Sequence, residues 1–383
     1  MNDPVWSSRV PAPGGITEEQ IQTIPASYGV VCVRDTAGKV ISLAASGDAR
    51  SFLAARLGPQ AEGANDLRPV AGTYEIMRCL SIFEADLAFI RESAVLDPGL
   101  HDRVTRKLRI WWLATHTDAS RAEWVWETDP AAFDESMRVI GPFLEKKGVR
   151  RHASNLDAAF ELCRYPDELH KAPAGRACAY KEMGKCPGAC DGSESLGAYE
   201  LRLAEALAFD ASVAEARRGE INERMREAAL AEDFEVAAQC KSDLSSWDAF
   251  DKRYAGVVAD LGMHSYAVVT QGDRAGVAAV LAVDRGRWAR ACELELEAGE
   301  AAAVAASASV LAALGSFRGL QGCGDLGVLG VLGRELLRPS RGGPGFVRID
   351  RLEGSILLQA ARRVVKTPRA DQPDQRRNAP RDE

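Results

Sequence analysis

Four of the nine cysteines in this 383-residue chain are gathered in one short segment. They are Cys163, Cys178, Cys186 and Cys190, and 14, 7 and 3 residues separate them. The intervening residues include many glycines and prolines, which disfavour a regular helix or strand. Four thiolates on such a loop can surround one tetrahedral ion or one cubane centre. The pattern therefore predicts a metal-binding loop, and it constrains the fold more than any other feature.

The spacing of these cysteines leaves two kinds of centre open. Structural zinc commonly takes paired CxxC knuckles, which this chain lacks. The Cys186-Pro187 step and the single closing C-x3-C favour an iron–sulfur cluster, with zinc as the alternative. The other cysteines occur singly in apolar or helical settings and are expected to pack as small hydrophobic residues. They are Cys32, Cys79, Cys240, Cys292 and Cys323.

Composition and charge narrow the class of protein. Hydrophobic residues make up 46% and charged residues 27%, which is typical of globular domains and excludes a disordered or collagen-like chain. The net charge of −7 argues against a general polycation for nucleic acid. Residues 145–190 nevertheless carry 9 basic and 6 acidic side chains, so this segment is locally basic. Residues 191–246 carry 13 acidic and 6 basic side chains and are a poor surface for DNA.

The rim of the cysteine segment carries the cations that could contact phosphates. They are Arg176, Lys181 and Lys185.

No secretion signal is visible in the sequence. The alanine-rich run 301–317 is slightly short for a membrane span and is expected to form a soluble helix. Together with the many cysteines, this predicts a cytoplasmic protein with reduced thiols.

Local patterns predict a series of elements along the chain. Residues 28–33 and 39–43 are predicted to form a β-hairpin that turns at Gly38. Helices are predicted over 49–57, 74–95, 154–163 and 196–218, and strands over 108–114 and 123–127. A two-helix pattern at 220–248 turns near residues 231–233. Strands are predicted at 266–270, 277–283 and 288–296, and helices within 301–338.

The residues around the cysteines resemble a known family. The segment FELCRYPDELHKAPAGRACAYKEMGKCPGACDG resembles the cysteine region of UvrC, a component of the ABC excinuclease. Cys178, Cys186 and Cys190 match the last three cysteines of that pattern in their spacing, and Cys163 matches the first with a slightly longer gap. In that family these cysteines hold a four-iron, four-sulfur (4Fe-4S) cluster, so the resemblance favours iron–sulfur over zinc.

A second resemblance lies in the two-helix pattern. The segment INERMREAALAEDFEVAAQCKSDL, residues 221–244, looks like the UVR motif of UvrC and its excinuclease partner UvrB. The resemblance implies that this hairpin docks onto UvrB, since small alanines allow close helix approach and leave an apolar edge. The residues expected to bind the partner are Met225, Ala229, Phe234, Ala238 and Leu244. A helical hairpin without any partner is the alternative.

A third resemblance covers residues 24–57, which look like the opening of a GIY-YIG nuclease domain. The framework positions match, but the chemical positions do not. Where the family has two tyrosines, an arginine and a metal-binding glutamate, this chain reads Val31, Ser42, Phe52 and Phe89. Metal-dependent phosphodiester hydrolysis needs hard oxygen ligands, so no catalytic residue is assigned. If the register slips, the polar candidates are Tyr28, Arg50, Glu84, Asp86 and Glu92.

These features together predict an α+β protein with several parts. We expect a flexible leader at 1–23, a degenerate GIY-YIG-like domain at 24–140, and a cysteine-rich metal-binding region with a helix at 141–218. The UVR helical hairpin at 219–248, an α/β region of unknown role at 254–366 and a disordered tail at 367–383 follow. The RNase H-like and helix-hairpin-helix parts of UvrC are expected to be missing.

The resemblance implies a DNA-repair factor of nucleotide excision repair that binds UvrB, DNA or both, and that is non-catalytic. One alternative is an active excinuclease-type DNA endonuclease that uses Mg²⁺ and displaced residues. Another alternative is a UVR-containing zinc adaptor outside DNA repair, although such adaptors use CxxC pairs.

Overall fold

The computed structural model describes residues 4–209, 211–248, 250, 254, 256–318, 320 and 322–366. The fold is mixed α+β, as predicted. The chain divides into two compact units: one combines the segments before Arg109 and after His264, and the other is Arg109–His264. The predicted tail at 367–383 lies outside the described residues.

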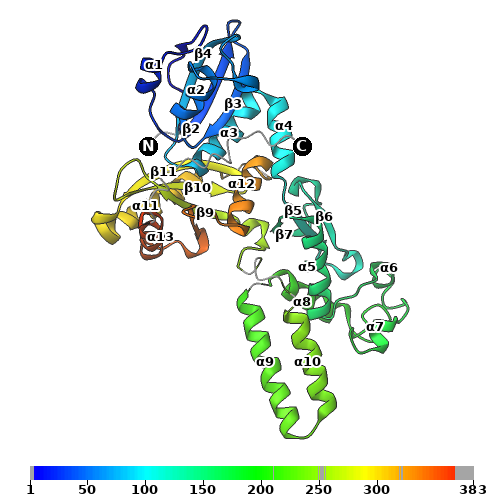
Figure 1. The fold of residues 1–383 in the computed structure, drawn as a ribbon. Coiled ribbons are helices and arrows are strands. Elements are labelled where there is room, and N and C mark those ends of the chain that lie inside the picture. Colours follow the sequence, from blue (N-terminus) through cyan, green and yellow to red (C-terminus); the bar gives the residue numbers. More distant parts are fainter. Residues whose placement is uncertain are drawn as a thin grey trace. The chain divides into compact units, whose positions relative to one another are not determined.

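The first unit contains two four-stranded antiparallel sheets and the helices around them (Figure 1). Its elements before the second unit are β1 (Val10–Pro11), α1 (Glu18–Thr23), β2 (Gly29–Asp35), β3 (Val40–Ser46), α2 (Ala49–Leu57), β4 (Ala71–Arg78), α3 (Ile82–Leu96) and α4 (Pro98–Leu108). Those after it are β9 (Ser265–Gln271), β10 (Val277–Asp284), β11 (Arg287–Glu295), α11 (Gly299–Gly315), α12 (Leu326–Leu337), β12 (Gly345–Arg348) and α13 (Gly354–Lys366). The strand orders are β1-β4-β2-β3 and β11-β10-β9-β12.

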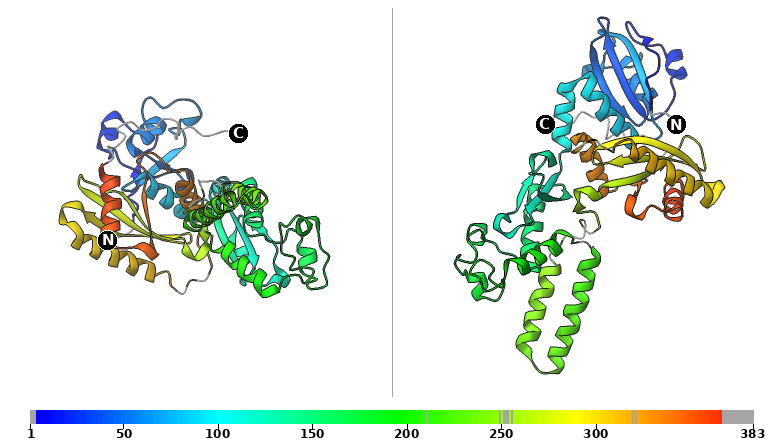
Figure 2. Two further views of the ribbon diagram at one scale, coloured as in Figure 1. Left: turned by 90° about the horizontal axis from the view of Figure 1, so that it is seen from below. Right: turned by 180° about the vertical axis from the view of Figure 1, so that it is seen from behind.

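Helix α3 is shared between the two sheets. Its buried residues Phe83 and Leu87 belong to one apolar cluster with Val30 of β2 and Leu281 of β10. Helices α1 and α2 cover the other face of the first sheet, and α11 and α13 cover the other face of the second (Figure 1; Figure 2). Because both faces of each sheet are covered, every residue of the central strand β10 is buried, which accounts for its continuous apolar sequence.

Local side chains explain the predicted hairpin and the first long helix. Asp35 Oδ1 accepts hydrogen bonds from the backbone N–H groups of Ala37 and Lys39, both at 2.9 Å, and Gly38 has φ of +85°. This turn joins β2 to β3, and it confirms the predicted hairpin. Asp48 then caps α2 by accepting from the N–H groups of Arg50 and Ser51.

The second unit contains a sheet of order β6-β5-β7-β8 and most of the remaining helices. Its elements are β5 (Trp111–His116), β6 (Val125–Glu127), β7 (Met137–Phe143), α5 (Lys146–Ala159), α6 (Pro166–Leu169), α7 (Ala179–Glu182), α8 (Leu196–Leu207), α9 (Ala211–Leu230), α10 (Phe234–Asp248) and β8 (Ala259–Asp260). Helix α5 packs on β5 and β7.

An aromatic cluster joins the elements of this second unit. His152 of α5 lies between Phe143 of β7, with ring centroids 5.0 Å apart, and Phe250, at 5.4 Å. Phe209 stacks on Phe250 at 4.4 Å and contacts Trp247 of α10 at 5.9 Å. Burial of His152 lowers the pKa of its imidazole to about 4, so the ring is neutral at physiological pH. The base of the α9–α10 hairpin is thus packed against α5.

Three predicted elements are wrong at their boundaries. Residues 74–78 belong to strand β4, because they pair with β2 in the sheet, and the helix begins only at Ile82. The helix predicted at 154–163 is α5, which begins at Lys146 and ends at Ala159. The single helix predicted at 196–218 is divided between α8 and α9, since Phe209 leaves the helical path to pack in the aromatic cluster.

The predicted leader and domain boundaries also differ from the structure. Residues 10–11 pair with β4, and Ala12, Ile16 and Ile21 are buried, so the described part of the leader is folded onto the first sheet. The predicted boundary at 140 falls inside strand β7. The region predicted as a separate C-terminal domain instead shares its core with the N-terminal segment. These contacts join residues too far apart in the sequence for local patterns to reveal.

One apolar helical stretch stands out in the sequence. Residues Leu296–Gly315 are long and apolar enough to cross a membrane by length and composition alone. In the structure, Ala303, Ala306 and Val310 of α11 are buried in an apolar cluster with β10 and α13. This is the packing of a helix on a sheet.

Candidate functional site

The four clustered cysteines lie on the connection between α5 and α8 in the second unit (Figure 1). This connection, residues 163–190, contains the short helices α6 and α7 and otherwise turns, as its composition predicts. Cys186 and Cys190 are buried, and Cys163 and Cys178 are half-buried. Gly188 lies between the two buried cysteines with φ of +90°, and a Cβ there would stand 2.8 Å from Lys181 Cε. A glycine is therefore required for the chain to turn between them.

The thiols of this loop influence one another electrostatically. Burial is the main cause that raises the pKa of the Cys163 thiol to about 11, and the negative charge of the other three cysteines acts in the same direction. Burial is also the largest cause of the raised pKa values of Cys186 and Cys190, and both of these thiols are affected by Cys178. The loop thus brings the four predicted ligands within electrostatic reach of one another. A positive metal centre would reverse this unfavourable charge arrangement.

Two arginines lie beside the loop, and Arg202 already pairs with both carboxylate oxygens of Glu194. Arg164, next to Cys163, stacks over the ring of Tyr180 at 4.2 Å, and its buried Nη1 has no hydrogen-bond partner among the described residues. The positive charge of Arg202 on α8 opposes the rise in the pKa of Cys186. A buried donor without a partner is costly, so an acceptor is expected beside Arg164. A cluster held by four thiolates supplies negative sulfur acceptors.

The geometry does not form a closed site for a single ion. Within the described ranges, no three His, Cys, Asp or Glu side chains converge closely enough to hold one metal ion. One ion needs all its thiolates around a single centre, whereas each iron of a cubane takes its own thiolate. Four thiols are the donor set that an iron–sulfur centre takes, so the chemistry of the residues alone is compatible with such a centre.

The three cations predicted to contact phosphates have different surroundings. Arg176 and Lys185 are exposed on the loop. Lys181 Nζ donates to Asp191 and to Ser193. The hydrogen bonds that the Asp191 carboxylate accepts from Lys181 and from Ser193 lower the pKa of this carboxyl to about 2. Lys181 therefore closes the end of the loop in this conformation. Arg176 and Lys185 remain accessible for contacts with an anionic ligand.

The predicted UVR segment forms an antiparallel helical hairpin, α9–α10 (Figure 1; Figure 2). The turn between the helices is closed by Glu232, which has φ of +57°, and by Asp233, whose Oδ1 accepts from Val236 N–H. Ala228 and Cys240 are buried between the helices. Of the predicted partner-binding residues, Met225 and Leu244 are half-buried, and Ala229, Phe234 and Ala238 are exposed.

The tip of this hairpin exposes large apolar side chains. Phe234 is 73% exposed and Leu230 is 86% exposed. Leu230 is a residue that the sequence reasoning missed, although it directly precedes the predicted turn. These two neighbouring side chains form a small exposed apolar surface at the hairpin tip.

The positions that correspond to nuclease residues are apolar and packed. Val31 of β2 and Phe52 of α2 are buried in the cluster on the outer face of the first sheet. Phe89 of α3 packs against the cluster between the two sheets. Ser42 is half-buried on β3. These side chains offer one hydroxyl group and no carboxylate.

The polar candidates for a displaced nuclease centre are engaged within the protein. Arg50 Nε donates to the carbonyl oxygen of Ile24 at 2.6 Å. Glu84 has no exposed surface; its Oε1 accepts from Arg290 Nε at 2.8 Å and its Oε2 accepts from Leu80 N–H at 2.7 Å. Glu92 accepts from Trp6 Nε1 at 3.0 Å. Tyr28 and Asp86 also have partners. The structure therefore does not bring these candidates together as a solvent-accessible centre.

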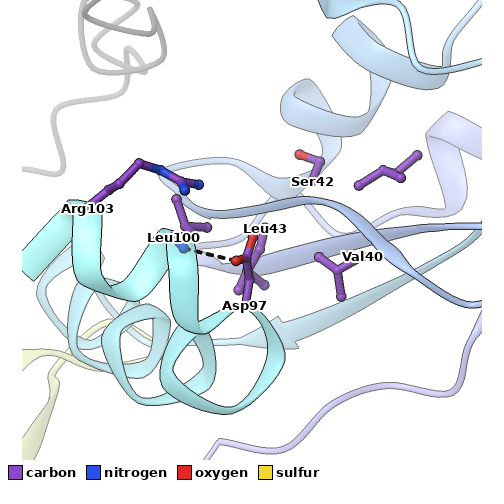
Figure 3. A pocket seen from close by; sticks show the side chains of 7 residues that line it. Val40, Ser42, Leu43, Asp97, Leu100 and Arg103 are labelled. Atoms are coloured by element: carbon purple, nitrogen blue, oxygen red, sulfur yellow. Dashed lines mark hydrogen bonds between the residues drawn. The ribbon is translucent and has the colours of Figure 1, made fainter.

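A pocket of about 240 Å³ lies beside strand β3, where the second tyrosine of the nuclease pattern would stand (Figure 3). It is lined by Val40, Ile41, Ser42, Leu43, Asp97, Leu100 and Arg103. Asp97 is the one carboxylate in this lining, and its Oδ1 accepts from Leu100 N–H at 2.9 Å at the start of α4. One carboxylate that caps a helix is a poor basis for a metal site.

Comparison with protein families gives a match for the middle of the chain. Residues 110–209 match the family described as "UvrC/Cho excinuclease, middle domain". The match includes strands β5, β6 and β7 of the second unit, the cysteine loop and α8. No solved structure matches the chain.

Curated relatives extend the similarity beyond this domain. "UvrABC system protein C" of Chlorobium luteolum is 24% identical over 284 residues, which are 70% of this chain and 44% of that protein. The same-named protein of Corynebacterium aurimucosum is 26% identical over 268 residues, 68% of this chain and 37% of that protein. The chain thus spans about two fifths of the length of the curated relatives it matches. With the matched middle domain, these similarities make the chain UvrC-like.

Proposed function

We propose that this UvrC-like chain acts in nucleotide excision repair as a binding factor without nuclease activity of its own. It holds an iron–sulfur cluster on Cys163, Cys178, Cys186 and Cys190. It binds UvrB through the α9–α10 hairpin and DNA through the basic side of the cysteine loop. Its place of action is the cytoplasm, where thiols stay reduced.

The cysteine loop is the observation that carries this proposal. It lies within the residues that match the UvrC middle domain, and its four thiols lie within electrostatic reach of one another beside Arg164. A bound cluster would supply four covalent attachments to a segment with little regular structure. The same segment presents Arg176 and Lys185 to solvent, so closing the loop would also fix two cations that can contact phosphates.

The hairpin supports the partner assignment. Phe234 and its neighbour Leu230 form an apolar tip on a hairpin whose flanks are acidic and polar. A second helical hairpin could bury these side chains, which is the pairing implied by the resemblance to the UVR motif. The relatives' shared name refers to the UvrABC system, and this supports UvrB as the partner.

The packing of the nuclease-like positions supports a non-catalytic role. Phe52 and Phe89 lie in apolar clusters, and Glu84 is completely buried in an ion pair with Arg290. A catalytic metal ion needs accessible oxygen ligands and a water molecule. Restoring these groups would require the shared core of the first unit to open.

An incision and retention assay tests the proposal. Anaerobically purified chain is mixed with damaged duplex DNA, UvrA, UvrB, ATP and Mg²⁺ or Mn²⁺. We expect retention of the chain on the UvrB–DNA complex and no incision that depends on it. Incision that depends on the wild-type chain would instead support the displaced nuclease.

Metal analysis of the same preparation separates the remaining alternative. Iron and acid-labile sulfide in near-equal amounts would support the cluster. Zinc without iron, combined with no retention on the UvrB–DNA complex, would favour an adaptor outside DNA repair.

A further inference from the structure

Four cations are concentrated at the beginning of helix α5, outside the cysteine loop. They are Lys146, Lys147, Arg150 and Arg151, and all four are exposed. The helix has no acidic residue in its first turn, and the side chain of Glu145 at the N-cap makes no capping hydrogen bond. Among the described residues, no carboxylate forms an ion pair with any of the four cations.

This arrangement is electrostatically unfavourable for the isolated protein. Lys146 and Arg150 stand four residues apart on one side of the helix, and Lys147 and Arg151 repeat that spacing beside them. Like charges at this spacing repel one another. The positive end of the helix dipole adds to the repulsion. An anionic ligand would remove both costs at once.

Two tryptophans lie beside the first pair of cations. The Nζ atom of Lys146 is 5.5 Å from the ring centre of Trp111 on β5 and 6.0 Å from that of Trp126 on β6. The guanidinium carbon of Arg150 is 5.7 Å from the ring centre of Trp126. Both rings are half-buried. These distances are at the outer limit of cation–π contact, so the exposed cations can leave the rings at small cost.

The position of the rings in the sheet makes them accessible to a ligand. Strand β6 is at the edge of its sheet, and it consists of three residues. Trp126 pairs with Leu113 of β5, which places the ring on the same face of the sheet as Trp111. The α5 cations border that face at the same end. The four side chains therefore form one surface, which we call the Trp–Lys surface: Trp111, Trp126, Lys146 and Arg150.

Flat aromatic rings beside exposed cations suit one class of ligand best. Unpaired bases stack on tryptophan rings while lysine and arginine contact the phosphates. A base inside a duplex is already stacked and cannot use the rings, and an acidic peptide offers charge without flat aromatic groups. We infer that the Trp–Lys surface binds a single-stranded segment of nucleic acid. This inference takes the ligand class from the proposed function, but it uses residues separate from the cysteine loop.

Binding of a labelled oligothymidine to the full chain tests the inference by fluorescence anisotropy. Trp126→Ala is expected to weaken binding about tenfold, because one stacked base is lost. Trp126→Phe keeps an aromatic ring and most of the packing, and should retain most of the affinity. The Lys146→Gln/Arg150→Gln double variant should lower the slope of log affinity against log salt by about 1.4, since each lost phosphate contact contributes about 0.7.

Matched controls separate stacking from general charge. Arg224→Gln/Arg226→Gln removes the same charge from exposed positions on α9 of the same unit, and it should leave the salt slope unchanged. An abasic oligomer of equal length should bind the wild type more weakly than oligothymidine. It should bind the Trp126→Ala variant and the wild type alike. Equal affinity of the wild type for both oligomers, or for polyglutamate, would overturn the inference.

Variants of the cysteine loop distinguish this inference from the proposed function. If Arg176→Gln/Lys185→Gln abolishes oligothymidine binding while the Trp126 and Lys146/Arg150 variants bind normally, the Trp–Lys surface is refuted and the loop keeps its proposed role. If the loop variant binds normally and the Trp–Lys variants do not, the inference stands and the loop loses its role in DNA contact.

Discussion

The cysteine loop and the first sheet agree with different parts of the patterns that they resemble. The loop keeps the four cysteines of its pattern on a segment with little regular structure. The first sheet has a hairpin, a capped helix and α3 where the resemblance implies a nuclease framework, but Phe52 and Phe89 stand where charged residues are expected. Packing alone accounts for these residues of the sheet, whereas packing does not account for four cysteines on a loop with little regular structure.

The largest expected effect belongs to the loop. Cys186→Ser should abolish the bound iron, and the loop should become sensitive to proteolysis because no packed core replaces the lost attachment. Iron analysis and limited proteolysis of the full chain measure both outcomes. Cys323→Ser, at a half-buried position outside the cluster, should retain its iron. A soluble Cys186→Ser protein with full metal content would refute the ligand assignment.

The next largest effect concerns the sheet region. Glu84→Gln should destabilise the first unit by about 3–5 kcal/mol, because it leaves the Arg290 guanidinium charged without its buried partner. Hydrogen exchange of the β9 and β11 amides measures this loss. Glu92→Gln on the same helix, at a partly exposed ion pair, should cost about 1 kcal/mol or less. If both variants exchange alike, Glu84 has no structural role and could serve another function.

A pH titration tests the packing of His152 in the aromatic cluster of the second unit. Unfolded His152 titrates near pH 6.5, whereas the folded ring has a pKa of about 4. As the pH falls, the unfolded state therefore binds a proton before the folded state does. The contribution of His152 to the free energy of unfolding is fully present above pH 6.5, and about 3 kcal/mol of it is lost towards pH 4. Chemical denaturation of the wild type and of His152→Phe between pH 7 and 4 compares the two slopes.

Protonation of the Asp157 carboxyl has the opposite effect on stability as the pH falls, so the measurement requires a control. Burial raises the pKa of its carboxyl from 3.8 to about 6, so the folded state binds that proton first and gains stability as the pH falls. An Asp157→Asn background removes the opposing contribution of this carboxyl, so the loss of stability towards pH 4 should become steeper. An equal slope in the His152→Phe variant and the wild type in that background would contradict the assignment.

The smallest expected effect concerns the hairpin tip. Phe234→Ser should weaken retention on UvrB about tenfold, because the ring is exposed and available to a partner. The free energy of unfolding should change by less than about 0.5 kcal/mol, since no core contact is lost. Titration of UvrB with labelled chain measures the affinity, and Glu235→Gln beside it serves as a neutral neighbour. Unchanged retention would place the contact elsewhere.

Sequence reasoning succeeded where structure is local. The hairpin at Gly38, helix α2 and the turn at Glu232 depend on neighbouring side chains, and these were predicted. Arg164 was missed as a neighbour of the proposed metal site, although its place directly after Cys163 was a visible signal. The sharing of α3 between two sheets could not be predicted, because Glu84 and Arg290 are 206 positions apart and no local pattern connects them.

The distance in sequence between Glu84 and Arg290 determines when the core around α3 can form during synthesis. At about 5–20 residues per second, a ribosome needs roughly 10–40 s to travel the 206 positions from Glu84 to Arg290. During that interval the α3 carboxylate and the apolar side chains around it have no second sheet to cover them. The second unit is translated within the same interval and can fold first. A nascent chain that stalls before β9 would therefore expose α3 to chaperones and proteases.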